Sequence, residues 1–250
     1  MVRVFLTGRL TVVGADGSFD EADLPGTQGR VAFAALALHH DPLARDDLAD
    51  LVWDNDTLPG AWSQALNSIV SKVRRLLTSI GVDGRAALRQ VGGSYQLVVP
   101  SDWWIDAEDA VRRLDRAEGA ARHGDWKAAA TDATVAASIF RRPFLTGSEG
   151  LWVERERARL RNAQYRSHEV LAESWIEQHD PGLAATIARQ AIELDPLRES
   201  AYRLAIRAEL ARGDRAAAAL VFRRCEQTLR DELGITPSAD TRHLRDQLGP

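Results

Sequence analysis

Residues 62–77 read WSQALNSIVSKVRRLL, and this stretch decides the fold of the first part of the chain. Its apolar residues recur at steps of three and four, the spacing that places them on one buried helix face: Trp62, Leu66, Ile69, Val73, Leu76 and Leu77. The opposite face carries amides, hydroxyls and cations: Gln64, Asn67, Ser68, Ser71, Lys72, Arg74, Arg75 and Thr78. Amides pair with adenine, arginine pairs with guanine, and serine and lysine suit phosphates. This mixture is the one that a helix needs in the major groove of DNA.

A solvated amphipathic helix is the alternative interpretation, because mixed polar helix faces are common. The distribution of charge argues for binding. Between Trp62 and Gly92 five cations stand against one acid, whereas the rest of residues 1–100 holds four cations against ten acids. Positive charge is therefore concentrated around this helix, although the whole chain has a net charge of −4.

The neighbouring segments predict a winged helix-turn-helix. Upstream, we expect a small antiparallel sheet from Val2–Leu6, Leu10–Val13 and Phe19–Leu24, then a helix over Gln28–His40 and a short one over about Asp46–Trp53. Pro59 suits the first position of the third helix. Downstream, Arg85–Val91 and Tyr95–Val99 flank Gly92-Gly93-Ser94, which is the signature of a β-hairpin. A hairpin after such helices places Arg85 and Arg89 where they can reach an adjacent DNA backbone.

Beyond Pro100 strand signals disappear and alanine-rich helical patterns follow. A shift of 34 residues lays Asp180 on Asp214 and Ala184 on Ala218, and 34 is the tetratricopeptide period. His123-Gly124-Asp125 begins the same turn-plus-alanine pattern further upstream. We therefore predict about three helical repeats. The fold class is α+β: an N-terminal winged helix-turn-helix over residues 1–100, followed by an all-α, tetratricopeptide-like repeat domain over 101–250.

The same sequence argues against an enzyme. It holds no GxxxxGK[ST], GxGxxG, HExxH or GxSxG motif, and its six histidines lack metal-ligand spacing. We expect no cofactor and no metal. The single cysteine, Cys225, aligns with Ala191 of the preceding repeat and is expected to be a small buried packing residue. With no apolar run of membrane length and no signal-peptide pattern, we expect no membrane contact and a cytoplasmic location.

For the remaining histidines and tryptophans we expect structural roles. We expect His168, His179 and His243 on polar helix faces, and the tryptophans of the second half, among them Trp104 and Trp175, at helical positions as packing wedges. In the long helix that begins at Trp152 we expect the charged side chains to pair with one another. The alternative is that they form a contact surface for DNA or a protein partner.

Several runs resemble one family of actinobacterial transcription activators, the antibiotic regulatory (SARP) family. The similar runs in the first half are Gln28–Leu36, Leu48–Trp53, Gln64–Leu77 and Tyr95–Leu97. In the second half, Trp152-Val153-Glu154 and Leu229–Ser238 are similar to the bacterial transcriptional activator domain. The resemblance covers nearly the whole chain, and its motifs are specific in combination.

The resemblance implies an OmpR-type winged helix that reads direct repeats near promoters of a secondary-metabolite (antibiotic) gene cluster. It also implies a helical domain that recruits RNA polymerase holoenzyme through its sigma factor and other subunits, with self-association on the DNA. The residues that it places at DNA are Arg30, Gln64, Asn67, Ser68, Ser71, Lys72, Arg74, Arg75 and Arg89. Since the predicted sheet begins at Val2, we expect neither a receiver domain nor an ATPase module.

Departures from the family pattern sustain a second hypothesis. Gln28 and Lys72 stand where the family usually has a cation and an arginine, Gln64 where it often has Asn, and Ala44 where Ser or Thr would cap the second helix. Residues 1–100 are also net negative, which weakens a grip on phosphates. The alternative is an interaction or ligand-sensing scaffold whose winged helix does not bind DNA.

Overall fold

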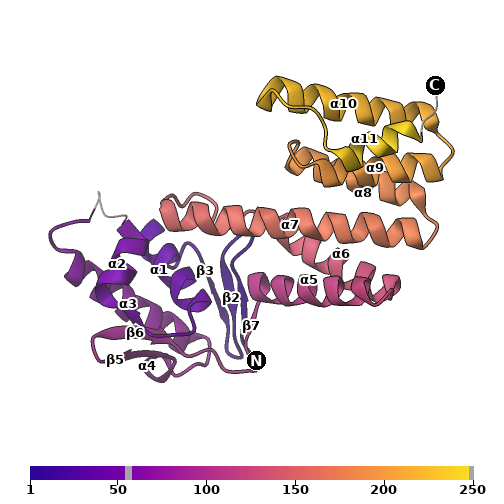
Figure 1. Ribbon diagram of the computed structural model, residues 1–250. Coiled ribbons are helices and arrows are strands. Elements are labelled where there is room, and N and C mark those ends of the chain that lie inside the picture. The colour runs from indigo at the N-terminus through magenta and orange to yellow at the C-terminus, as the bar shows by residue number, and fades with distance from the viewer. Residues whose placement is uncertain (54–57, 248–250) are drawn as a thin grey trace. The chain divides into compact units, whose positions relative to one another are not determined.

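The computed structural model describes residues 1–53 and 58–247 (Figure 1). The chain forms two compact units. The first contains Met1–Asp109 and Arg142–Leu160, and the second contains Ala110–Arg141 and the chain from Arg161 onward. The domain boundary at residue 100 stays a prediction, because the first compact unit also includes segments that come later in the sequence.

A four-stranded sheet opens the first unit. Its strands, in spatial order, are β3 (Ser18–Asp20), β2 (Thr11–Val13), β1 (Arg3–Phe5) and β7 (Trp104–Ile105). The expected antiparallel pairing of β1, β2 and β3 is present. The expectation of no strand beyond Pro100 was wrong, because β7 pairs in parallel with β1 and sets Ile105 opposite Val4. A strand of two residues is too short to leave a periodic signal in the sequence.

The buried carboxylate of Asp106 fastens this sheet to the start of helix α5 (Asp106–Arg122). Its oxygens accept hydrogen bonds from the backbone nitrogens of Leu6 at 2.8 Å and Thr7 at 3.1 Å, and from the Thr7 hydroxyl at 2.6 Å. A carboxylate without exposed surface is tolerated in a core only when its oxygens are satisfied in this way. Asp106 thereby holds β7 and α5 in place.

The first unit also contains the winged helix, as predicted. Its helices are α1 (Gly26–Leu38), α2 (Arg45–Trp53) and α3 (Trp62–Ser79), and its sheet has the order β4 (Leu43–Ala44), β6 (Ser94–Leu97), β5 (Leu88–Val91). The hairpin of β5 and β6 is the wing. Gly92 and Gly93 form its two-residue turn with φ of +55° and +84°, a backbone that side chains rarely adopt.

Two boundaries differ from the predictions. Helix α3 begins at Trp62 rather than Pro59, and the Pro59 carbonyl instead accepts a hydrogen bond from the Trp62 nitrogen at 2.9 Å. Arg85 lies in the short helix α4 (Gly84–Ala87) rather than in the wing strand. The cause is Asp83, whose side chain accepts hydrogen bonds from the Arg85 and Ala86 nitrogens and so caps a helical turn.

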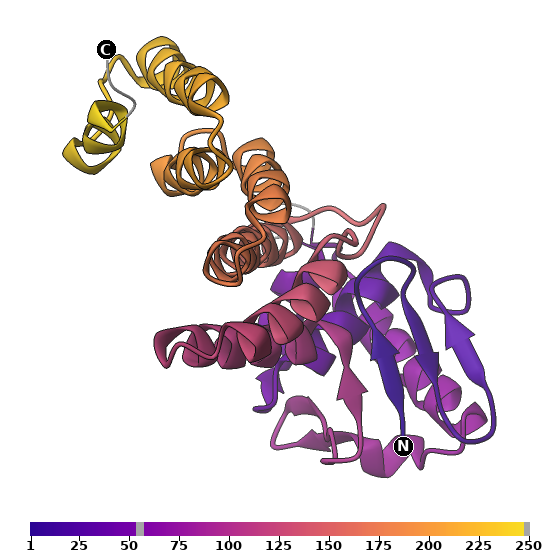
Figure 2. The same ribbon diagram turned by 90° about the vertical axis from the view of Figure 1, so that its right-hand side faces the viewer.

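The second unit is built from antiparallel helices stacked in chain order, as Figure 2 shows. They are α5 (Asp106–Arg122), α6 (Trp126–Phe140), α7 (Leu151–Glu177), α8 (Pro181–Leu194), α9 (Glu199–Ala211), α10 (Arg215–Leu233) and α11 (Ala239–Asp246), the first parts of α5 and α7 belonging to the first unit. Asp125, Asp180 and Asp214 each cap the second helix of a pair. Buried alanines such as Ala184 and Ala218 allow close helix packing. The tetratricopeptide-like prediction is confirmed.

Individual side chains in the second half partly match expectation. Cys225 is buried, as expected, and burial raises the pKa of its thiol to about 12. His168 is not on a polar face: only 7% of its surface is exposed. Trp104 lies in β7, not in a helix, where its ring packs edge-on against Phe5. Within residues 1–53 and 58–247, no helix is both long and apolar enough to cross a bilayer.

Candidate nucleic-acid interface

Helix α3 has the two faces that its sequence predicts. Leu66, Ile69, Val70, Val73 and Leu77 are buried. The residues of the opposite face are exposed or half-buried: Gln64, Asn67, Ser68, Ser71, Arg75 and Thr78 are exposed, and Lys72 and Arg74 are half-buried. The core therefore fixes the rotation of α3 about its axis, and most of the polar stripe is left facing solvent.

Hydroxyl groups of this stripe are not equally available. The Ser68 hydroxyl donates to the Gln64 carbonyl at 3.0 Å, and the Thr78 hydroxyl donates to the Arg74 carbonyl at 2.9 Å. Such bonds back to the preceding turn occupy the only proton of each hydroxyl. In the part of the chain that the structure describes, the Ser71 hydroxyl makes no such bond, so Ser71 can donate directly to a phosphate oxygen.

The wing is fastened to α3 by Tyr95. Its ring is buried, and its hydroxyl donates to Oδ1 of Asn67 at 2.9 Å. Since the amide oxygen of Asn67 faces Tyr95, the amide nitrogen and its two protons remain for an outside acceptor. The position of Asn67 on the exposed stripe thus depends on a residue of strand β6.

Arg45 fixes the start of the helix, one turn before Asn67. Its guanidinium donates to the Ser63 hydroxyl at 2.6 Å and lies 5.9 Å from the centre of the Tyr95 ring. Arg45 is the first residue of α2, so this contact joins α2, the start of α3 and the wing. This role of Arg45 was not predicted, because nothing in local spacing connects Arg45 with Ser63, 18 positions away.

Arg74 has a structural task. Its Nε donates to the Leu88 carbonyl at 2.9 Å and so ties α3 to the first residue of β5. Close by, Gly84 lets α4 approach the helix, since a Cβ at Gly84 would stand 2.0 Å from the Arg74 carbonyl oxygen. Arg74 is therefore only half available to a ligand, whereas Arg75 is exposed.

Two open hollows flank Arg75. One, of about 490 Å³, is lined by Gln28, Trp53, Ser68, Lys72 and Arg75 among others. The other, of about 560 Å³, is lined by Ser71, Arg74, Arg75, Thr78, Asp83 and Arg85. Arg75 stands on the ridge between them, so the structure brings together the cations of the helix and adds Arg85, which the site prediction omitted.

Arg30 and Arg89 line neither hollow. Arg30 is half-buried on α1 and its Nε donates to the Glu21 carbonyl at 3.2 Å. Arg89 is exposed on the wing strand β5. A flanking phosphate is the kind of ligand that suits both positions, since the backbone of a duplex extends beyond the groove that a helix enters.

Within residues 1–53 and 58–247 no group of three or more His, Cys, Asp or Glu side chains is arranged to hold a metal ion. The site consists instead of amides, hydroxyls and guanidinium groups on a helix backed by a hairpin.

The fold combines a winged helix with a tetratricopeptide-like domain. The sequence matches the Bacterial transcriptional activator domain over residues 105–248, and the chain belongs to this family, as its resemblance to the SARP regulators implies.

Known relatives agree with this assignment. The chain is 27% identical over 224 residues to the transcriptional regulatory protein EmbR of Mycobacterium tuberculosis, covering 88% of this chain and 56% of EmbR. It is 23% identical over 222 residues to MoaR1 of the same organism, covering 88% and 71%. A solved structure of EmbR in complex with a low affinity phosphopeptide superposes with a TM-score of 0.89 at 24% identity, over 99% of this chain and 64% of that one. It shares the fold. The chain thus spans little more than half of EmbR.

Proposed function

We propose that this regulator binds DNA sequence-specifically, with α3 in the major groove and the wing against the adjacent backbone. The observation that carries the proposal is the exposed stripe of α3, which is held in a fixed orientation by Tyr95, Arg45 and Arg74. Recognition requires side chains that are rigidly positioned from behind, since a bidentate contact to a base edge tolerates little displacement.

Charge limits the affinity of one copy. Lys72, Arg75, Arg85, Arg89 and the free part of Arg30 offer about five phosphate or base contacts, and affinity rises with the number of phosphates neutralised. A single winged helix with this count binds weakly at physiological salt. We therefore propose that two copies occupy a direct repeat, which multiplies their affinities through a high effective concentration.

Activation is then recruitment rather than catalysis. We propose that the helical repeats contact RNA polymerase holoenzyme, including its sigma factor, and that the regulated genes form a secondary-metabolite (antibiotic) cluster. The cytoplasm is the compartment in which this function operates. The class of the relatives, transcriptional regulators rather than enzymes, supports this proposal.

Selection of duplexes from a random pool tests the proposal. The full chain is used at about 50 and 150 mM salt, a range over which phosphate contacts weaken strongly. An enriched direct repeat is the expected result. No enrichment at either salt, together with capture of a defined protein partner by the repeat domain, would favour the scaffold hypothesis instead.

A further inference from the structure

A second kind of site lies in the helical unit, in a hollow of about 300 Å³ between α6, α7 and α8. Its lining includes His168, Leu171 and Trp175 of α7 and Ile187 of α8. This volume is at the lower end of the range for pockets that hold small molecules. The hollow lies within the second unit and takes no residue from the candidate DNA surface.

The hollow is polar at one end and apolar at the other. Helices α6 and α7 run antiparallel, because Gln178 near the end of α7 donates to the carbonyl of Trp126 at the start of α6. Arg141, which ends α6, therefore lies toward His168 and away from Trp175. Helix α8 turns back after Asp180, so Gln190 also lies toward His168.

His168 presents an unpaired ring nitrogen at the polar end. The side chain is only 7% exposed, and its Nδ1 lies 2.7 Å from the Gln164 carbonyl oxygen. Since a carbonyl can only accept, Nδ1 carries the proton of this bond and Nε2 is left over. No partner of Nε2 occurs in the ranges that the structure describes. Nε2 is not fully buried, so water or a ligand in the hollow can reach it, and with the proton on Nδ1 it can only accept a hydrogen bond.

The charge around the hollow has one sign. Arg141 is exposed and lines the rim, and no aspartate or glutamate lines the hollow. Among the described residues no ion pair engages Arg141. An anionic group would therefore find the Arg141 cation and the Gln190 amide at the same end, with no carboxylate lining the hollow to repel it.

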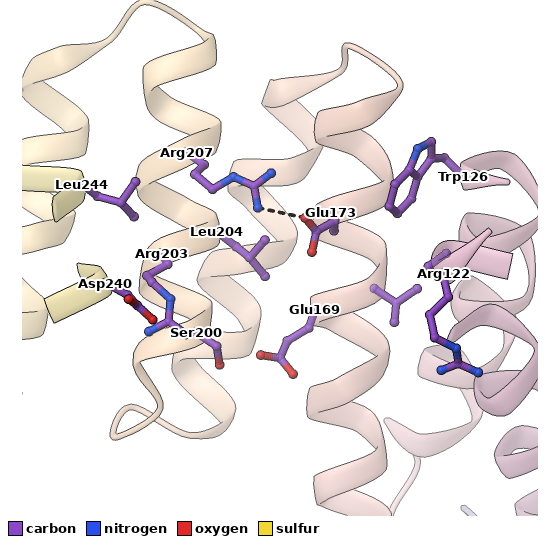
Figure 3. A pocket seen from close by; sticks show the side chains of 12 residues that line it. Arg122, Trp126, Glu169, Glu173, Ser200, Arg203, Leu204, Arg207, Asp240 and Leu244 are labelled. Atoms are coloured by element: carbon purple, nitrogen blue, oxygen red, sulfur yellow. Dashed lines mark hydrogen bonds and ion pairs between the residues drawn. The ribbon is translucent and has the colours of Figure 1, made fainter. Parts of the chain in front are cut away.

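The hollow on the concave face of the same unit is lined by charges of both signs. This hollow of about 680 Å³, drawn in Figure 3, is lined by Arg122, Arg203 and Arg207 but also by Glu169, Glu173 and Asp240. Arg207 already pairs with Glu173 at 2.9 Å. Because the charges around this larger hollow are balanced and partly paired, they favour neither an anionic nor a cationic ligand. We therefore propose no ligand for it.

We propose that the hollow between α6, α7 and α8 binds a small aromatic carboxylic acid in its ionised form. The carboxylate accepts hydrogen bonds from Arg141 and Gln190, while Nε2 of His168, which can only accept, is left to water. The ring lies on Trp175 between Leu171 and Ile187, where offset stacking and burial of apolar surface stabilise it. Such a site makes the repeat domain a receptor for a small acid, and it does not depend on DNA binding.

Calorimetric titration of the full chain with sodium 2-naphthoate tests this proposal. The expected result is saturable binding that Arg141→Gln weakens by roughly tenfold, the loss of one charge-assisted contact. The matched control is Arg122→Gln, an exposed arginine of the concave hollow, which should change the Kd by less than about twofold. The neutral analogue 2-naphthamide should bind at least roughly tenfold more weakly than the acid.

Three outcomes would overturn the proposal. They are an absence of saturable heat up to about 2 mM naphthoate, equal weakening by both arginine substitutions, and equal affinity for acid and amide. Because Arg141 is exposed, its substitution leaves the core intact and the comparison interpretable. A Gln190→Leu variant provides a second readout, with binding expected to fall while the melting temperature without ligand reports on the fold.

Discussion

The hydroxyl of Tyr95 donates a hydrogen bond of 2.9 Å to Oδ1 of Asn67, so that a buried residue of the wing orients a side chain on the exposed stripe of α3. Asparagine reads adenine by donating and accepting at once. With Oδ1 turned to Tyr95, Asn67 is best placed to donate, and the major-groove acceptors are guanine N7 and O6, thymine O4 and adenine N7, so that adenine loses the advantage of its second contact.

Tyr95→Phe should therefore alter base preference more than affinity. Removing the hydroxyl frees Oδ1 of Asn67, and we expect adenine to rise at one position of the selected site. Stability should fall by about 1 kcal/mol, the usual value of one such hydrogen bond. Duplex selection with both proteins measures the first effect and thermal unfolding the second. An unchanged base preference in a folded variant would show that Tyr95 only packs.

Substitutions of the neighbouring residues Arg74 and Arg75 should have different effects. Arg75→Gln removes an exposed cation, so we expect weaker binding to the selected duplex, a salt slope reduced by about 1, and unchanged stability. Arg74→Ala removes the bond to the Leu88 carbonyl, so we expect a loss of about 2 kcal/mol in stability. Arg3→Gln, an exposed arginine on β1, is the matched control and should change neither quantity. Destabilisation by Arg75→Gln would contradict this assignment.

Helix α11 should be attached in a pH-dependent manner. Glu199 on α9 accepts hydrogen bonds from the backbone nitrogen and the hydroxyl of Ser238, which precedes α11. Burial alone would raise the pKa of this carboxyl, but hydrogen bonds from Thr241 and Ser238 outweigh burial and hold the pKa below its usual value. A depressed pKa means that the stabilisation is complete above the unfolded value and is lost as pH falls through the folded one.

Glu199→Gln measures this contribution. The wild type should melt above the variant at pH 7, and the difference should shrink as the pH is lowered to about 4 and below. Glu193→Gln, an exposed glutamate on α8, serves as the control and should show no such convergence. A gap between wild type and Glu199→Gln that is the same at every pH would contradict a role for the ionised carboxylate.

Cys225 should be unreactive until the chain unfolds. Burial raises the pKa of its thiol to about 12, so the nucleophilic thiolate is scarce at pH 8, and the side chain has no exposed surface. We expect maleimide to label the native protein slowly and the unfolded protein at once. Rapid labelling of the native state, followed by mass spectrometry, would show that α9 and α10 open locally around this residue.

The sequence predicted the architecture because its signals are local. The steps of three and four in α3, the Gly92-Gly93 turn and the 34-residue spacing of Asp180 and Asp214 each report a short-range constraint. Strand β7 was missed because two residues have no period, and the role of Arg85 was misplaced because the Asp83 cap outweighed the strand pattern.

The candidate site was predictable in outline only. The stripe residues were correctly placed on the outer face, but their hydrogen bonds were not foreseeable. Arg74 bonds to Leu88, Asn67 to Tyr95 and Arg45 to Ser63, all across 14 or more positions of sequence. Contacts of that kind depend on how elements pack, and spacing alone carries no information about them. His168 was misassigned for the same reason, since burial by α6 and α8 is not visible in the pattern of α7.

The central claim is that the exposed face of α3 enters the DNA groove, and a tethered cleavage reagent tests it most directly. The chain has one cysteine, which is buried, so Ser71→Cys can be labelled selectively with an iron chelate that cuts nearby sugars. We predict cuts confined to a few base pairs within the selected repeat, and none from the same label at Arg9→Cys, an exposed position between β1 and β2. Tight binding of labelled Ser71→Cys protein without localised cuts, or equal cutting from Arg9→Cys, would contradict the claim.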